Sequence, residues 1–296
     1  MSHSPSDPAS RQLPNRTRRS ESIPRRLLAE RKYHLLPVYA LLTTSDLARE
    51  GIRNSGSFRF ADHIYRNEPS GRYGVGRVVD RVLLRLRGTR SMRNRFFHSR
   101  REILRAVRET SAPGAADQIV VLSVPCGIAR DLFEVAEILH RDEPALYENV
   151  RFVGIDLDNE PLDLSCELTK DHPAFDFRCA DALKAESFPV GVDIIVSLGF
   201  GEFLSDGMLY DFYRRCHSSL NNGGRFITSA SRRDRISDYL ARELAELYAH
   251  YRSAEQLTDL LKSAGFVKIQ TTRDEVGFQT LAVAEKGGGG GGGGGP

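Results

Sequence analysis

Hydrophobic and polar positions along the chain follow two different patterns, and the change from one to the other comes near residue 116. Short continuous apolar runs follow that point, at 119–123, 150–155, 175–179, 192–197 and 225–229. Runs of this kind are typical of strands buried on both faces of a parallel sheet. Helical patterns separate most of the runs, and the first has apolar residues at i, i+3, i+4 and i+7: Leu132, Val135, Ala136 and Leu139. The alternation predicts an α/β fold with a doubly wound, mostly parallel sheet.

The C-terminal part of this domain departs from a purely parallel arrangement. Two further strands are predicted at 266–272 and 278–284, and five residues, Arg273 to Gly277, connect them. A crossover helix does not fit into so short a connection, so the two strands must be antiparallel. The expected architecture is a seven-stranded sheet that finishes in a C-terminal antiparallel hairpin.

Residues 25–115 show helical patterns without strands. An apolar block spans 35–42, and a second set of apolar residues recurs at near-helical spacing: Val78, Val79, Val82, Leu83 and Leu86. Ser99 and Glu102 have the spacing of a capping box, which predicts a helix that begins there. Because these helices are rich in Arg, we expect them to pack on the domain that follows instead of building an independent core.

The two ends of the chain are excluded from the predicted fold. Residues 1–24 are rich in Ser, Pro and Arg with almost no apolar pattern, which indicates a disordered basic arm. Residues 287–296 are a glycine run closed by Pro296, which indicates a flexible tail. The predicted organisation is therefore an arm, an Arg-rich helical cap over 25–115, a ligand-binding domain over 116–286 and a tail.

Composition excludes several classes of protein. Hydrophobic residues make up 40% of the chain and charged residues 27%, which is ordinary for a globular protein. No apolar run approaches the roughly 18 residues of a membrane span, and the N-terminus lacks the apolar centre of a signal peptide. The four cysteines have neither disulfide-framework nor zinc spacing. We expect a reduced, cytoplasmic protein without a metal site.

The net charge of +3 conceals an uneven distribution. Residues 1–110 carry 24 Lys or Arg against 10 Asp or Glu, and the remainder carries 18 against 29. The basic region is open to three interpretations: a solvated cap whose Arg stems cover apolar surface, recognition of an acidic or acyl-carrier-linked partner, or RNA binding. No RNA-module signature is present, and no basic amphipathic helix of the kind that binds membrane surfaces is evident. Neither a nucleic acid nor a membrane is the predicted partner.

Ligands of doubly wound sheets lie outside the carboxyl ends of the strands, so these ends carry the candidate chemistry. The first strand ends in a turn of small residues, Ser123-Val124-Pro125-Cys126-Gly127-Ile128-Ala129. The second ends at Asp156, where a carboxylate can accept hydrogen bonds from ribose hydroxyls, and the third at Asp181, where it can accept from an exocyclic amine. The fourth ends in another small-residue turn, Ser197-Leu198-Gly199-Phe200-Gly201-Glu202. A single Asp in such a place is often only a helix cap, whereas the combination predicts a nucleoside-containing ligand.

With these residues, the segment 117–286 resembles the class I S-adenosylmethionine-dependent methyltransferases. The resemblance implies S-adenosyl-L-methionine as cofactor, with Asp156 at the ribose and Asp181 at the adenine amine. It further implies that the cofactor is contacted by the first turn, by residues beside the two acids and by the fourth strand end: Ser123, Pro125, Gly127, Ala129, Leu157, Ala182, Ser197 and Gly199.

The glycine-rich turn departs from the family pattern. The usual DxGxGxG is Ser123-Val-Pro-Cys-Gly-Ile-Ala here, with one of the three glycines and no leading acid. The Ser-Val-Pro-Cys-Gly form is also similar to a little-characterised bacterial branch of the family, which includes enzymes linked to making fatty-acid methyl esters.

The fourth strand end narrows the predicted reaction. The (N/D)PP(Y/F) signature of many amino-group methyltransferases is missing, as is the Pro-Cys nucleophile of cytosine-C5 enzymes. The prediction is O-methylation of a small molecule, at a carboxylate or hydroxyl, by in-line methyl transfer. Tyr65, Phe200 and Glu202 are candidates for contact with the substrate, and no catalytic base is assigned. The alternative is a non-catalytic or RNA-directed cofactor-binding module; the oligomeric state is left open.

Overall fold

The computed structural model describes residues 22–54, 56–111 and 118–288. Residues 1–21 of the predicted arm and 289–296 of the predicted tail lie outside the described residues, as does the predicted boundary between 115 and 116. The division of the chain into these parts therefore stays a prediction.

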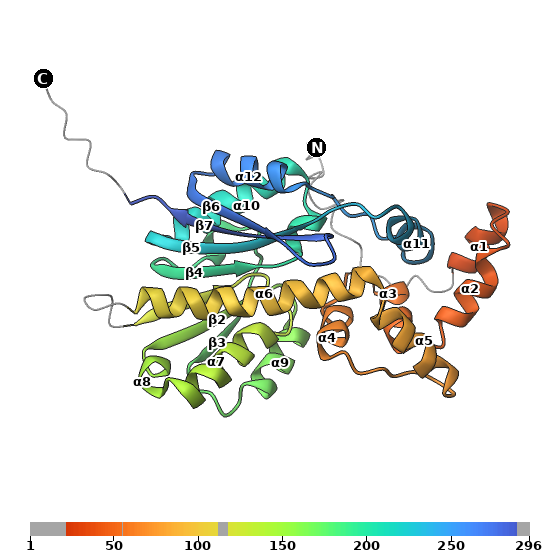
Figure 1. The fold of residues 1–296 in the computed structure, drawn as a ribbon, viewed down its shortest axis with the longest axis horizontal. Coiled ribbons are helices and arrows are strands. Elements are labelled where there is room, and N and C mark those ends of the chain that lie inside the picture. Colours follow the sequence, from red (N-terminus) through yellow and green to blue (C-terminus); the bar gives the residue numbers. More distant parts are fainter. Residues whose placement is uncertain (1–21, 55, 112–117, 289–296) are drawn as a thin grey trace, which may run out of the picture.

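The described residues contain one mixed sheet of seven strands, which confirms the predicted fold class (Figure 1). The strands are β1 (Ile119–Ser123), β2 (Val150–Asp156), β3 (Phe175–Cys179), β4 (Val192–Ser197), β5 (Leu220–Ser231), β6 (Phe266–Arg273) and β7 (Gln279–Lys286). Their order across the sheet is β3-β2-β1-β4-β5-β7-β6. The first five strands are parallel, and β7 pairs antiparallel with both β5 and β6. The hairpin expected from the short connection is thus inserted with its second strand next to β5.

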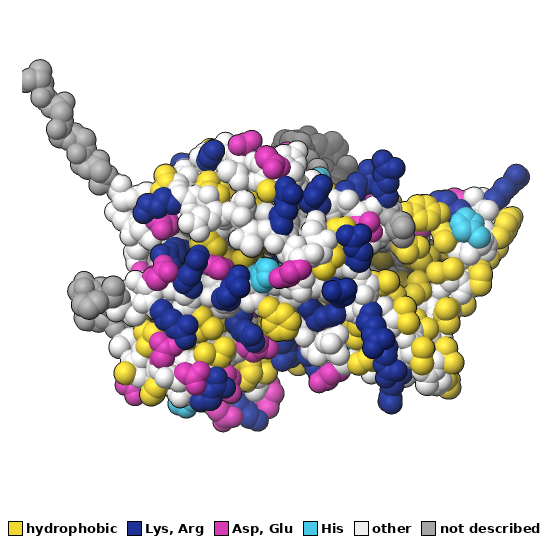
Figure 2. Space-filling view, in the orientation of Figure 1, with side chains coloured by type: hydrophobic (Ala, Val, Ile, Leu, Met, Phe, Trp, Pro, Cys, Tyr) yellow, Lys and Arg dark blue, Asp and Glu magenta, His cyan; other side chains and the backbone are white. Residues whose placement is uncertain are grey.

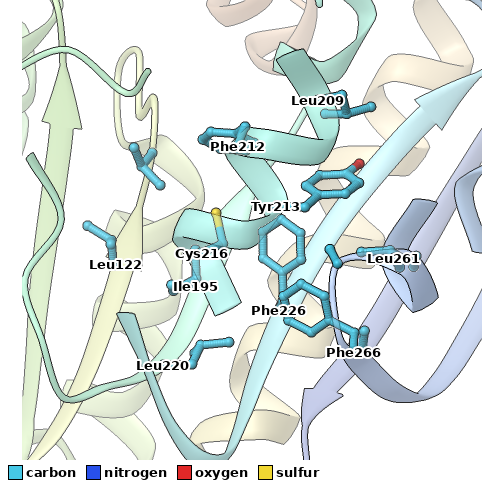
Figure 3. Packing of buried hydrophobic residues seen from close by; sticks show 14 of the residues in the cluster. Leu122, Ile195, Leu209, Phe212, Tyr213, Cys216, Leu220, Phe226, Leu261 and Phe266 are labelled. Carbon is cyan, nitrogen blue, oxygen red and sulfur yellow. The ribbon is translucent and has the colours of Figure 1, made fainter. Parts of the chain in front are cut away.

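Helices cover both faces of the sheet. On one face lie α6 (Arg87–Thr110), α7 (Arg130–Asp142) and α9 (Asn159–Leu168), and on the other α10 (Asp206–Ser219) and α12 (Ala254–Ser263). Figure 3 shows the second face, where Tyr213 of α10 meets Phe226 of β5 with ring centroids 5.3 Å apart. Every residue of β4 is buried, as expected for a central strand covered on both faces. The other helical elements of this part are α8 (Pro144–Tyr147), η2 (Ala185–Ser187), η3 (Phe200–Phe203) and α11 (Arg235–Ala245).

The N-terminal region is helical, as predicted. Its helices are α1 (Ser22–Ala29), α2 (Leu35–Leu42), α3 (Asp46–Arg53), α4 (Phe58–Arg66) and α5 (Val75–Leu84), followed by α6. Ile103 and Val107 of α6 belong to the core cluster of the sheet. The preceding helices form two small clusters, of which one includes Leu244 from α11. α1, α2 and α5 lie at one end of the molecule, on the right in Figure 1.

The predicted capping box at Ser99 is wrong. Ser99 lies in the middle of α6, which runs unbroken from Arg87 to Thr110, and its side chain is fully buried. The reason is packing: Phe96, Ser99, Ile103 and Val107 form one stripe along the helix, and burial of this stripe carries the helix through the position. Local capping propensity is worth less than the burial of three large apolar side chains.

Among the described residues, no helix is both long enough and apolar enough to cross a lipid bilayer. The cytoplasmic location stays a prediction.

Candidate functional site

The carboxyl ends of β1, β2 and β4 are joined through the turn that follows β1. The Cys126 amide donates to the Ile155 carbonyl at 2.8 Å, and the Val124 amide donates to the Val196 carbonyl at 2.9 Å. The turn is therefore fixed between its two neighbouring strands. Asp156 pairs in register with Cys179, so Asp181, two residues further along, lies at the same edge of the sheet. The structure brings together the strand ends that were predicted to hold a ligand.

Asp156 holds the small-residue turn in place. Its Oδ2 accepts a hydrogen bond from the Gly127 amide at 2.9 Å, and its Oδ1 accepts from the Asp158 amide at 3.2 Å. Gly127 has a φ of +52°, a conformation that favours glycine. Further along the turn, the Ala129 amide donates to the Ser165 hydroxyl at 3.0 Å.

The other predicted cofactor residues occupy a range of environments. Asp181 is half-buried, and its Oδ1 accepts from the Leu183 amide at 2.9 Å. Ala182 is buried, whereas the Leu157 side chain is 56% exposed. Five predicted residues remain. Ser123, Ala129 and Ser197 are buried, and Pro125 and Gly199 are half-buried.

Two neighbouring cavities lie between the N-terminal helices and this edge of the sheet. A cavity of about 510 Å³ is lined by the segment after β2 and by the α3–α4 segment. The first contributes Leu157, Asp158, Asn159 and Glu160, and the second Glu50, Asn54, Ser57, Phe58 and Arg59. A second cavity, of about 740 Å³, shares Glu50 and Arg59 with the first and reaches Ile128 and Arg130. Phe58 also covers the turn, since a β-carbon added at Gly127 would lie 3.4 Å from the β-carbon of Phe58. The α3–α4 segment thus covers the predicted cofactor edge.

Two of the three candidate substrate residues, Tyr65 and Glu202, are connected by Arg95, which the sequence did not identify. Arg95 Nη2 donates to the Tyr65 hydroxyl at 3.0 Å, and Nη1 donates to Glu202 Oε1 at 3.2 Å. The Tyr65 ring stacks on Phe96, with centroids 4.6 Å apart. The third candidate, Phe200, packs edge-on against Phe212 at the margin of the core. Tyr65 and Glu202 therefore belong to one polar cluster, and Phe200 is anchored elsewhere.

Arg95 lies at the fourth strand end. The residue is 5% exposed, and a β-carbon at Gly199 would lie 2.9 Å from Arg95 Nη1. The Arg95 Nε is buried and has no hydrogen-bond partner among the described residues. Because a buried donor without a partner is costly, this atom marks a place where an acceptor fits. One Arg among many on an Arg-rich helix gave no sequence signal for this role.

Asp131 is a second residue that the sequence did not identify. It is the second residue of α7, directly after the turn, and is 9% exposed. Burial raises the pKa of its carboxyl to about 6, although hydrogen bonds from backbone amides and the positive charge of Arg95 act in the opposite direction. Its negative charge also contributes, after burial and Asp156, to a pKa of the Cys126 thiol well above its usual range. Asp131 therefore interacts electrostatically with both Arg95 and the turn.

The comparisons with known proteins agree with this fold. A family model described as "Putative methyltransferase" matches residues 25–153, from α1 into β2. Among solved structures, a "possible exported protein" from Bordetella parapertussis is 23% identical with a TM-score of 0.71, over 84% of this chain and 85% of that one. No curated protein sequence matches the chain.

Two structures of known methyltransferases also match. The S-adenosylmethionine-dependent methyltransferase SibL is 13% identical, with a TM-score of 0.51 over 85% of this chain and 75% of that one. The magnesium protoporphyrin IX methyltransferase of Synechocystis PCC 6803 is 11% identical, with a TM-score of 0.51 over 76% of this chain and 93% of that one. Together with the sheet order, these two structures show that the chain has a methyltransferase-like α/β fold, in agreement with the resemblance seen in the sequence. The family match covers the N-terminal helices and the first part of this fold.

Proposed function

We propose that this chain transfers the methyl group of S-adenosyl-L-methionine to an oxygen atom of a small molecule, a carboxylate or a hydroxyl. The observation that carries the proposal is a pair of buried opposite charges, Arg95 and Asp131, at the edge of the sheet where Asp156 ends β2 and Asp181 follows β3. S-adenosyl-L-methionine has a zwitterionic amino acid at one end and an adenosine at the other. The two pairs of residues match these two ends.

Arg95 and Asp131 fit the methionine end. The Arg95 guanidinium has a buried Nε–H without a partner among the described residues, which fits a carboxylate. The Asp131 carboxylate fits the ammonium group and would take the place of the acid that the turn lacks at Ser123. Both side chains are buried, so their interactions with a bound charge are weakly screened by solvent.

The adenosine end would lie along the ends of β2 and β3. Asp156 would accept hydrogen bonds from the ribose hydroxyls while it continues to hold the Gly127 amide. Asp181 would accept from the adenine amine, with Leu157 and Ala182 beside the base. Leu157 already lines the cavity of about 510 Å³ under the α3–α4 segment. The turn from Ser123 to Ala129 and the strand end at Ser197 and Gly199 would pass beneath the cofactor.

The acceptor would be bound where the N-terminal helices meet the fourth strand end. Bound S-adenosyl-L-methionine supplies an electrophilic methyl group, and the protein's task is to align the acceptor oxygen with it. A carboxylate nucleophile needs no general base, which agrees with a site to which we assign none. Tyr65 and Glu202, joined through Arg95, would orient the acceptor, and the basic helices favour an acidic or acyl-carrier-linked one.

Methyl transfer from labelled cofactor to a panel of carboxylic acids, phenols and amines tests this proposal. From a carboxylic acid we expect a methyl ester, which releases labelled methanol in alkali. From a phenol we expect a methyl ether, which is stable in alkali. Transfer to amines alone would show that the acceptor class is wrong. Asp156→Ala, which removes the ribose contact, should abolish transfer of either kind.

A further inference from the structure

α5 has an apolar row of side chains that faces away from the protein. Val75, Val78 and Val82 follow one another at helical spacing and are 54%, 56% and 56% exposed, and Leu86 after the helix is 49% exposed. The buried side of α5 consists of Gly76, Asp80 and Leu84. A helix of this composition ordinarily buries its valines, so the orientation needs a cause.

Asp80 provides that cause. It is fully buried, and its carboxylate accepts hydrogen bonds from the Leu47 amide at 2.9 Å and the Ser70 amide at 3.0 Å. It also contacts the Ser45 hydroxyl at 2.5 Å and His63 Nε2 at 2.8 Å. Four partners from α3, α4 and the segment before α5 hold the polar side of the helix inward. The valine row is therefore turned outward.

The exposed row continues onto neighbouring segments. α2 contacts α5 and exposes Val38 (38%) and Leu41 (49%). Tyr33 and Tyr73, which precede α2 and α5, are 58% and 89% exposed. Figure 2 shows hydrophobic side chains gathered over the end of the molecule that α1, α2 and α5 form in Figure 1. We call the outward side chains of 73–86 and of α2 the apolar end face.

A row of arginines borders the apolar end face. Arg77 and Arg81 of α5 and Arg85 directly after it lie four residues apart, next to the valine row, and all three are exposed. Between Glu68 and Glu102 the sequence contains one acidic residue, the buried Asp80. The surface of α5 is thus apolar and positively charged, with no negative charge of its own.

From this arrangement we propose that the apolar end face binds an anionic phospholipid surface. Helices that lie in a membrane interface combine an apolar row, flanking Lys or Arg and aromatic side chains at the boundary. Arginine side chains beside the row add attraction to anionic headgroups. The proposal concerns docking onto a bilayer and not insertion through it. No basic amphipathic helix was evident in the sequence, and the proposal instead rests on the exposed side chains of α5.

Charge disfavours two other occupants of the apolar end face. A second copy of the chain would bring its own arginine row against this one. The segment 1–21 contains Arg11, Arg16, Arg18 and Arg19 against Asp7 and Glu21, so it is basic as well. An anionic surface complements the arginines, and its acyl region accepts the valines.

Co-sedimentation with vesicles tests the proposal. We expect the full chain to bind vesicles of phosphatidylcholine mixed with phosphatidylglycerol and to bind pure phosphatidylcholine far less. Val78→Asp/Val82→Asp and Arg77→Gln/Arg81→Gln should each lower the partition coefficient roughly tenfold or more. Val190→Asp is the matched control, because Val190 is a 91% exposed valine outside this surface, and it should bind like the wild type. Circular dichroism of each variant verifies folding.

Three results would overturn the proposal. The first is equal binding of the wild type to both kinds of vesicle. The second is a valine variant that binds as tightly as the wild type while the arginine variant does not, which would leave a purely electrostatic contact. The third is a wild-type dimer in analytical ultracentrifugation that the valine variant abolishes, without vesicle binding by either, which would make a second copy the occupant.

Discussion

The guanidinium of Arg95 lies directly against Gly199, so closely that a β-carbon at position 199 would be 2.9 Å from Nη1. Arg95 comes from the N-terminal helices, and Gly199 lies two residues after the end of β4. A residue of the helical region therefore reaches the strand edge where the cofactor was predicted. The helical region is part of the proposed site as well as a cover for it.

Arg95→Gln should weaken binding of S-adenosyl-L-methionine, because the cofactor carboxylate would lose its charged partner. Decarboxylated S-adenosylmethionine sharpens the test. The wild type should prefer the intact cofactor by at least tenfold, which corresponds to about 1.4 kcal/mol, and the variant should bind both compounds equally. Titration calorimetry measures both affinities. Arg101→Gln, at a 67% exposed site on the same helix, is the control and should keep the preference.

The raised pKa of Asp131 predicts how cofactor binding depends on pH. The carboxyl is neutral below about 6 and charged above it, and the anion is the form that attracts an ammonium group. Affinity for S-adenosyl-L-methionine should therefore rise as the pH increases through about 6. Asp131→Asn should remove this rise and bind weakly throughout. An unchanged pH profile in the variant would assign the ammonium group to another partner.

The same residue affects stability in the opposite direction. Because the folded-state pKa of Asp131 lies above the ordinary 3.8, the folded protein holds this proton more tightly than the unfolded chain. Its contribution to the free energy of unfolding is complete below the ordinary pKa and is lost as the pH rises through about 6. Urea unfolding of the cofactor-free protein at several pH values should show this loss, and Asp131→Asn should not.

Asp156→Ala should abolish cofactor binding for two reasons. The substitution removes the acceptor proposed for the ribose hydroxyls, and it also releases the Gly127 amide that shapes the turn. We expect a loss of affinity of roughly 100-fold or more, which corresponds to about 2.7 kcal/mol. Asp163→Ala, at an exposed carboxylate on α9, is the matched control. Equal affinity of Asp156→Ala and the wild type in calorimetry would contradict the assignment.

Asp80→Ala should destabilise the N-terminal helices by about 3 kcal/mol, since it leaves the buried donors of Ser45 and Leu47 and the half-buried amide of Ser70 without this acceptor. Burial alone would raise the pKa of Asp80, but the hydrogen bonds from His63, Ser45 and the two amides hold it below its usual value. The stabilisation is therefore present above the ordinary pKa of 3.8 and is lost as the pH falls through the lower folded-state value. Urea unfolding near neutral pH and in acid should show a smaller acid loss in the variant than in the wild type.

The sequence predicted the sheet well because its strands are short, continuously apolar and separated by clear helical patterns. It also predicted the C-terminal hairpin, since the length of the connection alone excludes a crossover. The candidate cofactor residues followed from strand ends, and the structure places Asp156 and Asp181 at one edge as expected. Whether these residues bind the cofactor stays a prediction.

The errors arose where tertiary contacts override local patterns. Ser99 has good capping chemistry, yet the packing stripe of Phe96, Ile103 and Val107 makes it a buried position inside a long helix. The helical spacing of Val78 and Val82 was predicted correctly, but it could not show which way they face, because the partners of Asp80 turn them outward. Arg95 could not be distinguished from its neighbours because its role depends on residues more than 100 positions away, Gly199 and Glu202.

α6 joins both halves of the protein in one uninterrupted rod of 24 residues. Arg95 near its start serves the strand edge, and Ile103 and Val107 further along fill the face of β1, β2 and β4. A fragment that begins at residue 116 would thus expose the apolar face of the sheet that α6 covers, and it would also lack Arg95. Removal of the N-terminal helices would therefore reduce solubility and ligand recognition together. A different N-terminal region could replace this one in evolution only if it also replaced the part of the hydrophobic core that α6 supplies.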